Sequence, residues 1–190
     1  MSEPRVKPTV ILPDTTPLVH LAAVDSLHLL NDLGRVVVVD VVVLEATYFQ
    51  DKPYAREIEA WIEAGKTPGS NRPVEVAATE LGPLYRLALD QHVKPPRNAG
   101  EIAITEWLSD ELRRLGGPAL VVYENGRVPA MLAREGVRET IAVATTRSML
   151  DLAQREGLIA DAEALWTRLI KVAPTANPAS ILTYIKPARS

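Results

Sequence analysis

The segment Arg35–Val39 restricts the fold of this chain more than any other part of the sequence. It contains four consecutive valines, whereas a strand with one face in water would alternate apolar and polar residues. A uniformly apolar strand is typical of a parallel sheet that is covered by helices on both faces. The run is broken at Asp40 and is too short to cross a bilayer. We therefore expect a buried, mostly parallel sheet.

Segments with strand and helix character alternate along the rest of the chain. Strands are expected at residues 9–12, 35–39, 74–78, 118–123 and 140–144. Helices are expected at residues 18–33, around Glu45, from a cap at Asp51 to Gly65, at 84–92, from Asn98 or Gly100 to Leu115, and at 128–135 and 148–156. In the first of these, apolar residues recur every three to four positions, at Leu18, Leu21, Val24, Leu27, Leu30 and Leu33. In the helix that ends at Leu115, the residues expected to face inward are Ile102, Ile104, Leu108, Leu112 and Leu115. This alternation predicts an α/β fold, a three-layer sandwich with a mostly parallel central sheet flanked by helices.

The length of 190 residues and the 47% hydrophobic composition are those of one compact domain with a substantial core. We expect residues 1–160 to form the body. Residues 161–190, with a helix near Ala162–Val172 and an extended segment at 181–185, are expected to form a C-terminal appendage packed on the same domain. Because no long apolar run and no signal-peptide pattern is present, we expect no membrane association and a cytoplasmic location.

Cysteine is absent, which excludes disulfides, iron–sulfur clusters and thiolate zinc sites. The histidines at 20, 28 and 92 show no ligand-like spacing, so any metal must be held mainly by oxygen. We interpret His20 and His28, which lie in an apolar segment, as packing or surface residues. The net charge of −3 argues against a protein that coats nucleic acid through bulk positive charge. It remains compatible with an enzyme that grips RNA briefly.

Acidic residues follow the expected strands, where an open parallel sheet forms its binding crevice. Asp14 follows the first strand, Glu45 lies one turn into the helix after the second, and Glu124 follows a later strand. Glu101 lies in the first turn of a helix and can point toward the same end of the sheet. Carboxylates that converge there repel one another, so they require protons or cations. Magnesium or manganese would suit such a cluster and phosphodiester hydrolysis.

Each of these carboxylates also has a structural interpretation. Asp14 would be a helix cap, but Thr16 before Pro17 already makes a good cap and first turn, so we favour metal binding. Glu45 would be a solvated helix residue. Glu101 would be a first-turn residue that the helix dipole stabilises.

Four segments of the chain match the motifs of a known family: Val-Ile-Leu-Pro-Asp-Thr-Thr-Pro-Leu at 10–18 and residues 43–46, 99–104 and 145–159. The first is similar to the strand and turn that open PIN domains, and the resemblance to this family continues in the other three. The first motif alone is moderately specific, and four in order are more so. The resemblance implies a PIN-like fold and a metal-dependent ribonuclease specific for single-stranded RNA, often the VapC-type toxin of a toxin–antitoxin pair. It also implies a homodimer and an antitoxin protein as partners.

By this resemblance, Asp14, Glu45 and Glu101 would bind Mg²⁺ or Mn²⁺, Glu124 would take the fourth acidic position, and Thr146 would supply a hydroxyl that helps to order the site. For Glu124 the alternative is a turn, since Asn-Gly follows it. Thr146, with Thr145, has the alternative of capping a helix. Arg147 would contact a phosphate or, as we favour, balance the charge of the acids.

Two other kinds of function compete with this interpretation. A catalytically decayed PIN-like binding or regulatory protein is the main alternative, and the Glu124-Asn125 sequence permits it. Response-regulator receivers and haloacid-dehalogenase-like phosphatases need a second acidic residue near Asp14, where Thr15 and Thr16 stand. We therefore regard these phosphoryl-transfer folds as remote.

Overall fold

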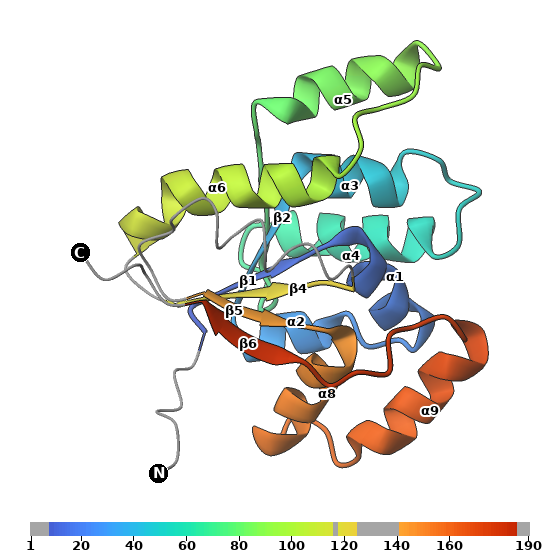
Figure 1. The fold of residues 1–190 in the computed structure, drawn as a ribbon, viewed down its shortest axis with the longest axis vertical. Helices are drawn as coiled ribbons and strands as arrows, with labels where there is room; N and C mark the ends of the chain where they lie inside the picture. Colours follow the sequence, from blue (N-terminus) through green and yellow to red (C-terminus); the bar gives the residue numbers. More distant parts are fainter. Residues whose placement is uncertain (1–7, 116–117, 125–140, 186–190) are drawn as a thin grey trace.

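A computed structural model describes residues 8–115, 118–124 and 141–185, which form an α/β fold around a six-stranded sheet (Figure 1). The strands are β1 (Val10–Pro13), β2 (Arg35–Val39), β3 (Val74–Ala77), β4 (Ala119–Val122), β5 (Ile141–Ala144) and β6 (Leu182–Ile185). Their order is β3-β2-β1-β4-β5-β6, with β1 to β5 parallel and β6 antiparallel to β5. The predicted α/β class with a mostly parallel sheet is confirmed.

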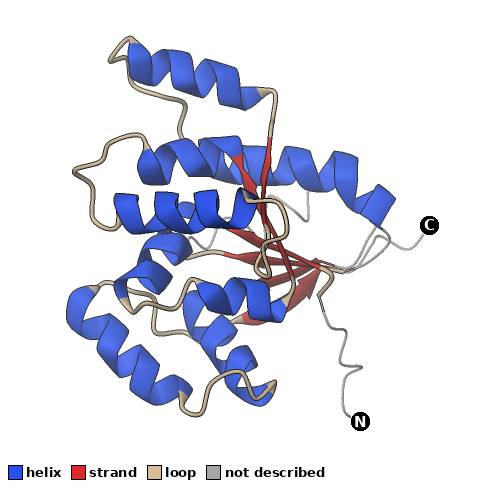
Figure 2. Ribbon diagram, turned by 180° about the vertical axis from the view of Figure 1, so that it is seen from behind, coloured by secondary structure: helices blue, strands red, loops and turns tan. Residues whose placement is uncertain are grey.

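Eight helices lie within the described ranges. They are α1 (Thr15–Ala23), α2 (His28–Leu33), α3 (Asp40–Thr47), α4 (Ala55–Lys66), α5 (Leu81–Asp90), α6 (Ala99–Leu115), α8 (Thr146–Arg155) and α9 (Ala162–Val172). Helix α6 crosses one face of the sheet, and α2 and α8 cover the other (Figures 1 and 2). This arrangement gives the three layers expected from the sequence. The helix predicted at 128–135 lies outside the described residues.

The valine run forms the buried strand that the sequence predicts. Val36, Val37, Val38 and Val39 are at most 1% exposed, and β2 pairs with β1 on one side and β3 on the other. Burying a valine side chain contributes about 1.5–3 kcal/mol of transfer free energy. Burial in the core therefore fixes the position of β2, from which the chain continues into the helix that contains Glu45.

The single helix expected at 18–33 is in fact two helices. Helix α1 ends at Ala23, Asp25 has φ +54°, and α2 begins at His28. A residue in the left-handed region cannot continue a right-handed helix, so the chain turns there. The apolar residues of the predicted pattern are nevertheless buried, namely Leu18, Leu21, Val24, Leu27, Leu30 and Leu33.

Helix α4 departs from its predicted boundaries. Asp51 does not cap it, because the helix starts at Ala55 after Tyr54, which has φ +63°. Gly65 lies inside the helix rather than ending it. A Cβ on Gly65 would lie 2.5 Å from a methyl carbon of Val74, so this glycine allows α4 to pack closely on β3.

Helix α6 confirms part of its predicted inward face. Ile104 and Leu108 are each 1% exposed, but Ile102 is 43% exposed, so its predicted burial is wrong. Residues two apart on a helix point about 200° away from one another, so Ile102 and Ile104 cannot share a face. The side chains of Leu112 and Leu115, also predicted to face inward, lie outside the described part of the structure.

The C-terminal region is joined to the sheet. Strand β6 pairs with β5 in the register Ala144↔Leu182 to Ile141↔Ile185, and α9 packs on α1 and α8. Residues 182–185 therefore extend the central sheet, and 162–172 cover one of its helices. None of the helices in the described ranges has both the length and the apolarity that crossing a bilayer requires.

Candidate metal centre at the switch point of the sheet

The order of the strands defines one place where a ligand crevice is expected. Strands β1 and β4 are adjacent, and the chain leaves them toward opposite edges of the sheet, which is the topological switch point of an open α/β sheet. Asp14 follows β1, and its amide donates to the carbonyl of Val122 in β4 at 2.8 Å. Glu124 follows β4 by two residues. The parallel pairing thus brings two predicted ligands from distant parts of the chain to one edge.

Asp14 is the N-cap of α1. Its side chain is buried, with the residue 8% exposed, and Oδ1 accepts a hydrogen bond from the amide of Thr15 at 2.8 Å. The prediction that Thr16 makes this cap is wrong, because α1 begins at Thr15, two residues before the expected start at Pro17. Capping does not exclude metal binding, since a carboxylate has about four lone-pair positions.

Glu45 and Asp14 face the same point beside α6. Oε2 of Glu45 accepts a hydrogen bond from the hydroxyl of Thr15 at 2.5 Å. A Cβ on Gly100 would lie 3.0 Å from Oδ1 of Asp14 and 3.2 Å from Oε2 of Glu45. Because Gly100 has no side chain, α6 can approach these two oxygens closely. The next residue, Glu101, is 9% exposed. From the sequence, Gly100 was expected only as a possible start of this helix.

Burial among like charges perturbs Asp14 most. Burial, and then the charges of Glu101, Glu45 and Glu124, raise the pKa of Asp14 from 3.8 to about 7, against the hydrogen bond from Thr15. The three other predicted carboxylates thus all act on Asp14. A cation placed among them would remove this cost of ionisation.

The pKa of Glu45 is also raised, first by burial and then by the charge of Glu101. Hydrogen bonds from Thr15 and Tyr85 and the charge of Lys52 oppose this rise. The Lys52 ammonium also donates to the backbone carbonyl of Glu45 at 3.1 Å, and burial with the nearby Glu45 raises the pKa of Tyr85 to about 12. Tyr85 and Lys52 were not expected at this site from the sequence, because only the fold brings α5 and the loop after α3 to Glu45.

Glu124 is held by partners on three segments. Oε1 accepts from the Thr146 amide at 3.0 Å and lies 3.5 Å from Nδ1 of His20, and Oε2 accepts from the Asn177 amide at 3.3 Å. Burial opposes ionisation, but hydrogen bonds from His20 and Thr146 outweigh it and lower the pKa of Glu124. Glu124 therefore stays ionised and joins β4 to α1, α8 and the C-terminal segment.

His20 and the two threonines take distinct positions around this carboxylate. His20 is buried, as one of its two interpretations predicts, and Nδ1 lies 3.4 Å from the hydroxyl of Thr146. Thr145 is the N-cap of α8 and accepts from the Ser148 amide at 3.2 Å. Thr146 is the first residue of the helix and is fully buried, so the capping role belongs to Thr145.

Arg147 balances the charge of acidic residues, but of residues in α8 and α9. Its guanidinium donates to Glu163 at 2.7 Å, lies 3.5 Å from Asp151, and sits 5.5 Å from the ring centroid of Trp166. Within the described part of the chain, its ion pairs are with these two acids and not with the four predicted ligands. The charge that Arg147 compensates is thus that of α8 and α9.

The donor set fits a hard divalent cation in its chemistry. Among the described residues, no three or more histidine or carboxylate side chains are already arranged as a group of metal ligands. Magnesium, however, retains much of its water shell and needs only one or two carboxylates. Asp14 and Glu45 offer two oxygens that converge beside Gly100, with a third carboxylate, that of Glu101, close enough to influence both of their pKa values.

Comparison of the chain with family models, with curated proteins and with solved structures gave no match. The fold and the site therefore define its class by themselves. It is an α/β protein with interacting buried carboxylates at the switch point of a mostly parallel sheet.

Proposed function

We propose that the chain is a PIN-like, divalent-metal-dependent endoribonuclease that hydrolyses phosphodiester bonds of single-stranded RNA with Mg²⁺ or Mn²⁺. One observation carries the proposal: Oδ1 of Asp14 and Oε2 of Glu45 converge beside Gly100, where an added Cβ would lie 3.0 and 3.2 Å from them, next to Glu101. The position of Asp14 at the switch point of the sheet and the four segments that resemble PIN domains support it.

Asp14, Glu45 and Glu101 would hold the cation. When bound, a divalent ion in such a site supplies an activated water and stabilises the leaving oxygen. The Thr15 amide and hydroxyl orient Asp14 and Glu45, which fixes both oxygens relative to β1. Gly100 places no side chain between them, and an added Cβ there would lie 3.0 and 3.2 Å from their oxygens.

Glu124 has a different part in the proposed site. Its charge raises the pKa of Asp14, so it adds to the negative potential that attracts a cation. Because its two oxygens already accept hydrogen bonds from Thr146 and Asn177, its main contribution is to hold the ends of β4 and α8 together. We further propose a homodimer with an antitoxin partner, on the family resemblance alone, and a cytoplasmic location, on the sequence pattern of the chain.

The direct test is incubation of the purified chain with single-stranded RNA in Mg²⁺, in Mn²⁺ and in chelator. We expect cleavage with either metal and none with chelator. Asp14→Asn keeps an acceptor for the Thr15 amide but removes the charge, so it should lower cleavage by at least about a hundredfold. The matched control is Asp161→Asn, which changes another N-cap aspartate, at the exposed start of α9, and should cut like the parent. Equal cleavage by the parent and Asp14→Asn would show that Asp14 is not a ligand, or that a contaminant cuts.

A decayed PIN-like binding or regulatory protein is the second candidate. The observation that favours it is the engagement of both Glu124 oxygens by main-chain amides, which occupies the fourth acidic side chain structurally. Thermal unfolding separates the two functions. A working site should raise Tm when Mn²⁺ is added at millimolar concentration, since a ligand that binds only the folded state stabilises it. A decayed site should leave Tm unchanged.

A further inference from the structure

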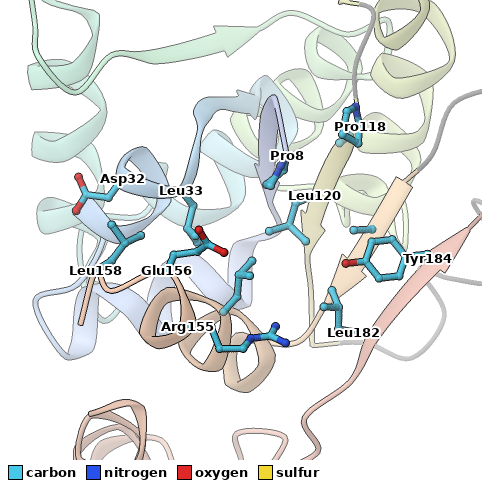
Figure 3. Close-up of a pocket in the computed structure, with 13 residues that line it drawn as sticks. Pro8, Asp32, Leu33, Pro118, Leu120, Arg155, Glu156, Leu158, Leu182 and Tyr184 are labelled. Atoms are coloured by element: carbon cyan, nitrogen blue, oxygen red, sulfur yellow. The ribbon is translucent and has the colours of Figure 1, made fainter. Parts of the chain in front are cut away.

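A hollow of about 310 Å³ lies between the sheet and helices α2 and α8 (Figure 3). Pro8 and Pro118, which precede β1 and β4, line it, so it belongs to the amino-terminal ends of these strands. Asp14 and Glu124 follow the carboxyl-terminal ends of the same two strands. We call this space the Ala142 hollow, and none of its lining residues takes part in the proposed metal site.

The floor of the Ala142 hollow is one row of residues across three strands. Leu120 of β4 pairs in register with Ala142 of β5, and Ala142 pairs with Tyr184 of β6. All three line the space, and Leu33 of α2 and Leu152 of α8 add apolar walls. The central residue of the row has only a methyl group between two large side chains. The space thus exists because alanine, rather than a larger residue, stands at position 142.

Charged and polar groups lie around this apolar floor. Asp32 is engaged by Arg72 at 3.5 Å, whereas Arg155, the last residue of α8, forms no ion pair within the described ranges. In Figure 3 the guanidinium of Arg155 points toward the β6 side, where the hydroxyl of Tyr184 is directed into the hollow. The carboxylate of Glu156 lies on the α2 side. Two hydrogen-bond donors therefore face one side of an apolar space.

We propose that the Ala142 hollow binds a small carboxylic acid with an aromatic or branched aliphatic body. The apolar body packs on Leu120, Ala142 and Leu152, and the carboxylate accepts hydrogen bonds from Arg155 and Tyr184. A guanidinium is well suited to a carboxylate because it presents several donors in one plane. The volume lies at the lower end of the range for small-molecule sites, about 300–1,000 Å³, which limits the ligand to roughly one substituted ring.

The test is ligand-observed NMR and calorimetry on the full chain with three probes of similar shape: phenylacetate, phenylacetamide and phenethylamine. We expect phenylacetate to bind with a millimolar or lower Kd, the neutral amide about tenfold more weakly, and the amine not at all. Arg155→Gln should weaken phenylacetate about tenfold, because it removes a charged donor. The matched control is Arg168→Gln, which changes an exposed arginine of α9 outside the hollow and should bind like the parent.

A second variant tests the apolar floor. Ala142→Leu should fill the space and abolish binding, and circular dichroism checks that this variant is folded. Arg155 is exposed, so Arg155→Gln is not expected to disturb the fold. It therefore still tests the proposal if Ala142→Leu does not fold. Asp14→Asn should bind phenylacetate like the parent, which separates this site from the proposed nuclease site. The proposal is overturned if phenylacetate does not bind, if Arg155→Gln leaves its affinity unchanged, or if phenethylamine binds more tightly.

Discussion

Two aspartates follow neighbouring strands of the sheet, and each is approached by a glycine in the first turn of a helix. At Asp40, after β2, Oδ1 accepts from the Val41 amide at 2.9 Å and the Thr79 hydroxyl at 2.7 Å, and Oδ2 accepts from the Thr79 amide at 3.1 Å. A Cβ on Gly82 would lie 1.8 Å from Oδ2 of Asp40. Hydrogen-bond donors and the backbone at Gly82 surround this carboxylate, and its hydrogen bonds link α3 to the start of α5.

At Asp14, after β1, the glycine stands farther from the carboxylate. A Cβ on Gly100 would lie 3.0 Å from Oδ1, and the neighbouring charges that act on Asp14 are those of Glu101, Glu45 and Glu124. The position after a parallel strand therefore does not by itself decide the role of an aspartate. The neighbouring groups decide it. Hydrogen-bond donors give Asp40 a structural role, and other carboxylates make Asp14 a candidate metal ligand.

The largest expected difference is in how stability depends on pH. Since the folded-state pKa of Asp14 is raised from 3.8 to about 7, its ionisation destabilises the metal-free fold progressively as pH rises through this interval. Asp14→Asn cannot ionise, so in chelator it should exceed the parent in unfolding free energy by up to about 4 kcal/mol near pH 8 and by little near pH 4. Urea unfolding of both proteins at several pH values measures this difference in free energy. A difference that does not depend on pH would contradict the raised pKa of Asp14.

Asp40→Ala should act in the opposite direction. It leaves the amides of Val41 and Thr79 and the Thr79 hydroxyl without their acceptor, so the unfolding free energy should fall by about 3 kcal/mol. Because this loss is structural, Mn²⁺ at millimolar concentration should still raise the Tm of the variant. If Asp40→Ala instead unfolded like the parent, Asp40 would not have the structural role that distinguishes it from Asp14.

The two glycines sharpen the contrast further. Gly82→Ala should cost about 2–3 kcal/mol of stability, because Asp40 is held by hydrogen bonds and cannot move aside. Gly100→Ala meets its neighbours at 3.0 Å and should cost only about 1 kcal/mol, yet its methyl group enters the space between Asp14 and Glu45. Calorimetry with Mn²⁺ should therefore show weaker binding for Gly100→Ala and parent-like binding for Gly82→Ala at a temperature where it is folded.

Glu124→Gln should have the smallest effect. The folded-state pKa of Glu124 is lowered, so its ionised form stabilises the fold above the ordinary pKa of 4.5, and this contribution is lost as pH falls through the folded pKa. We expect a loss of about 1 kcal/mol near pH 7 that shrinks in acid, measured by urea unfolding. A loss that grows as pH falls would contradict the assigned partners, His20 and Thr146.

Much of the scaffold was accessible from sequence because its signals are local. The valine run, the alternation of segments and the acids after strands predicted the parallel sheet and the edge at which Asp14 and Glu124 meet. The predicted start of α1 was wrong because two cap candidates stand two residues apart, and only the backbone shows that Asp14 rather than Thr16 takes this role.

The parts that sequence did not provide depend on contacts between distant residues. His20 lies in an apolar segment, and its contact with Glu124 exists only because β1 and β4 are neighbours. Gly100 looks like an ordinary helix start until Asp14 and Glu45 are placed beside it. The order of strands and the packing of α6 determine these relations, and no local pattern encodes them.

If the proposed site is correct, Asp14 and Glu45 share a divalent cation beside Gly100. This can be tested in crystals of the chain that are grown with Mn²⁺ and measured at the manganese absorption edge. We expect an anomalous-difference peak within coordination distance of side-chain oxygens of both residues. A fully occupied peak elsewhere, or none at this position in crystals that contain Mn²⁺, would contradict it.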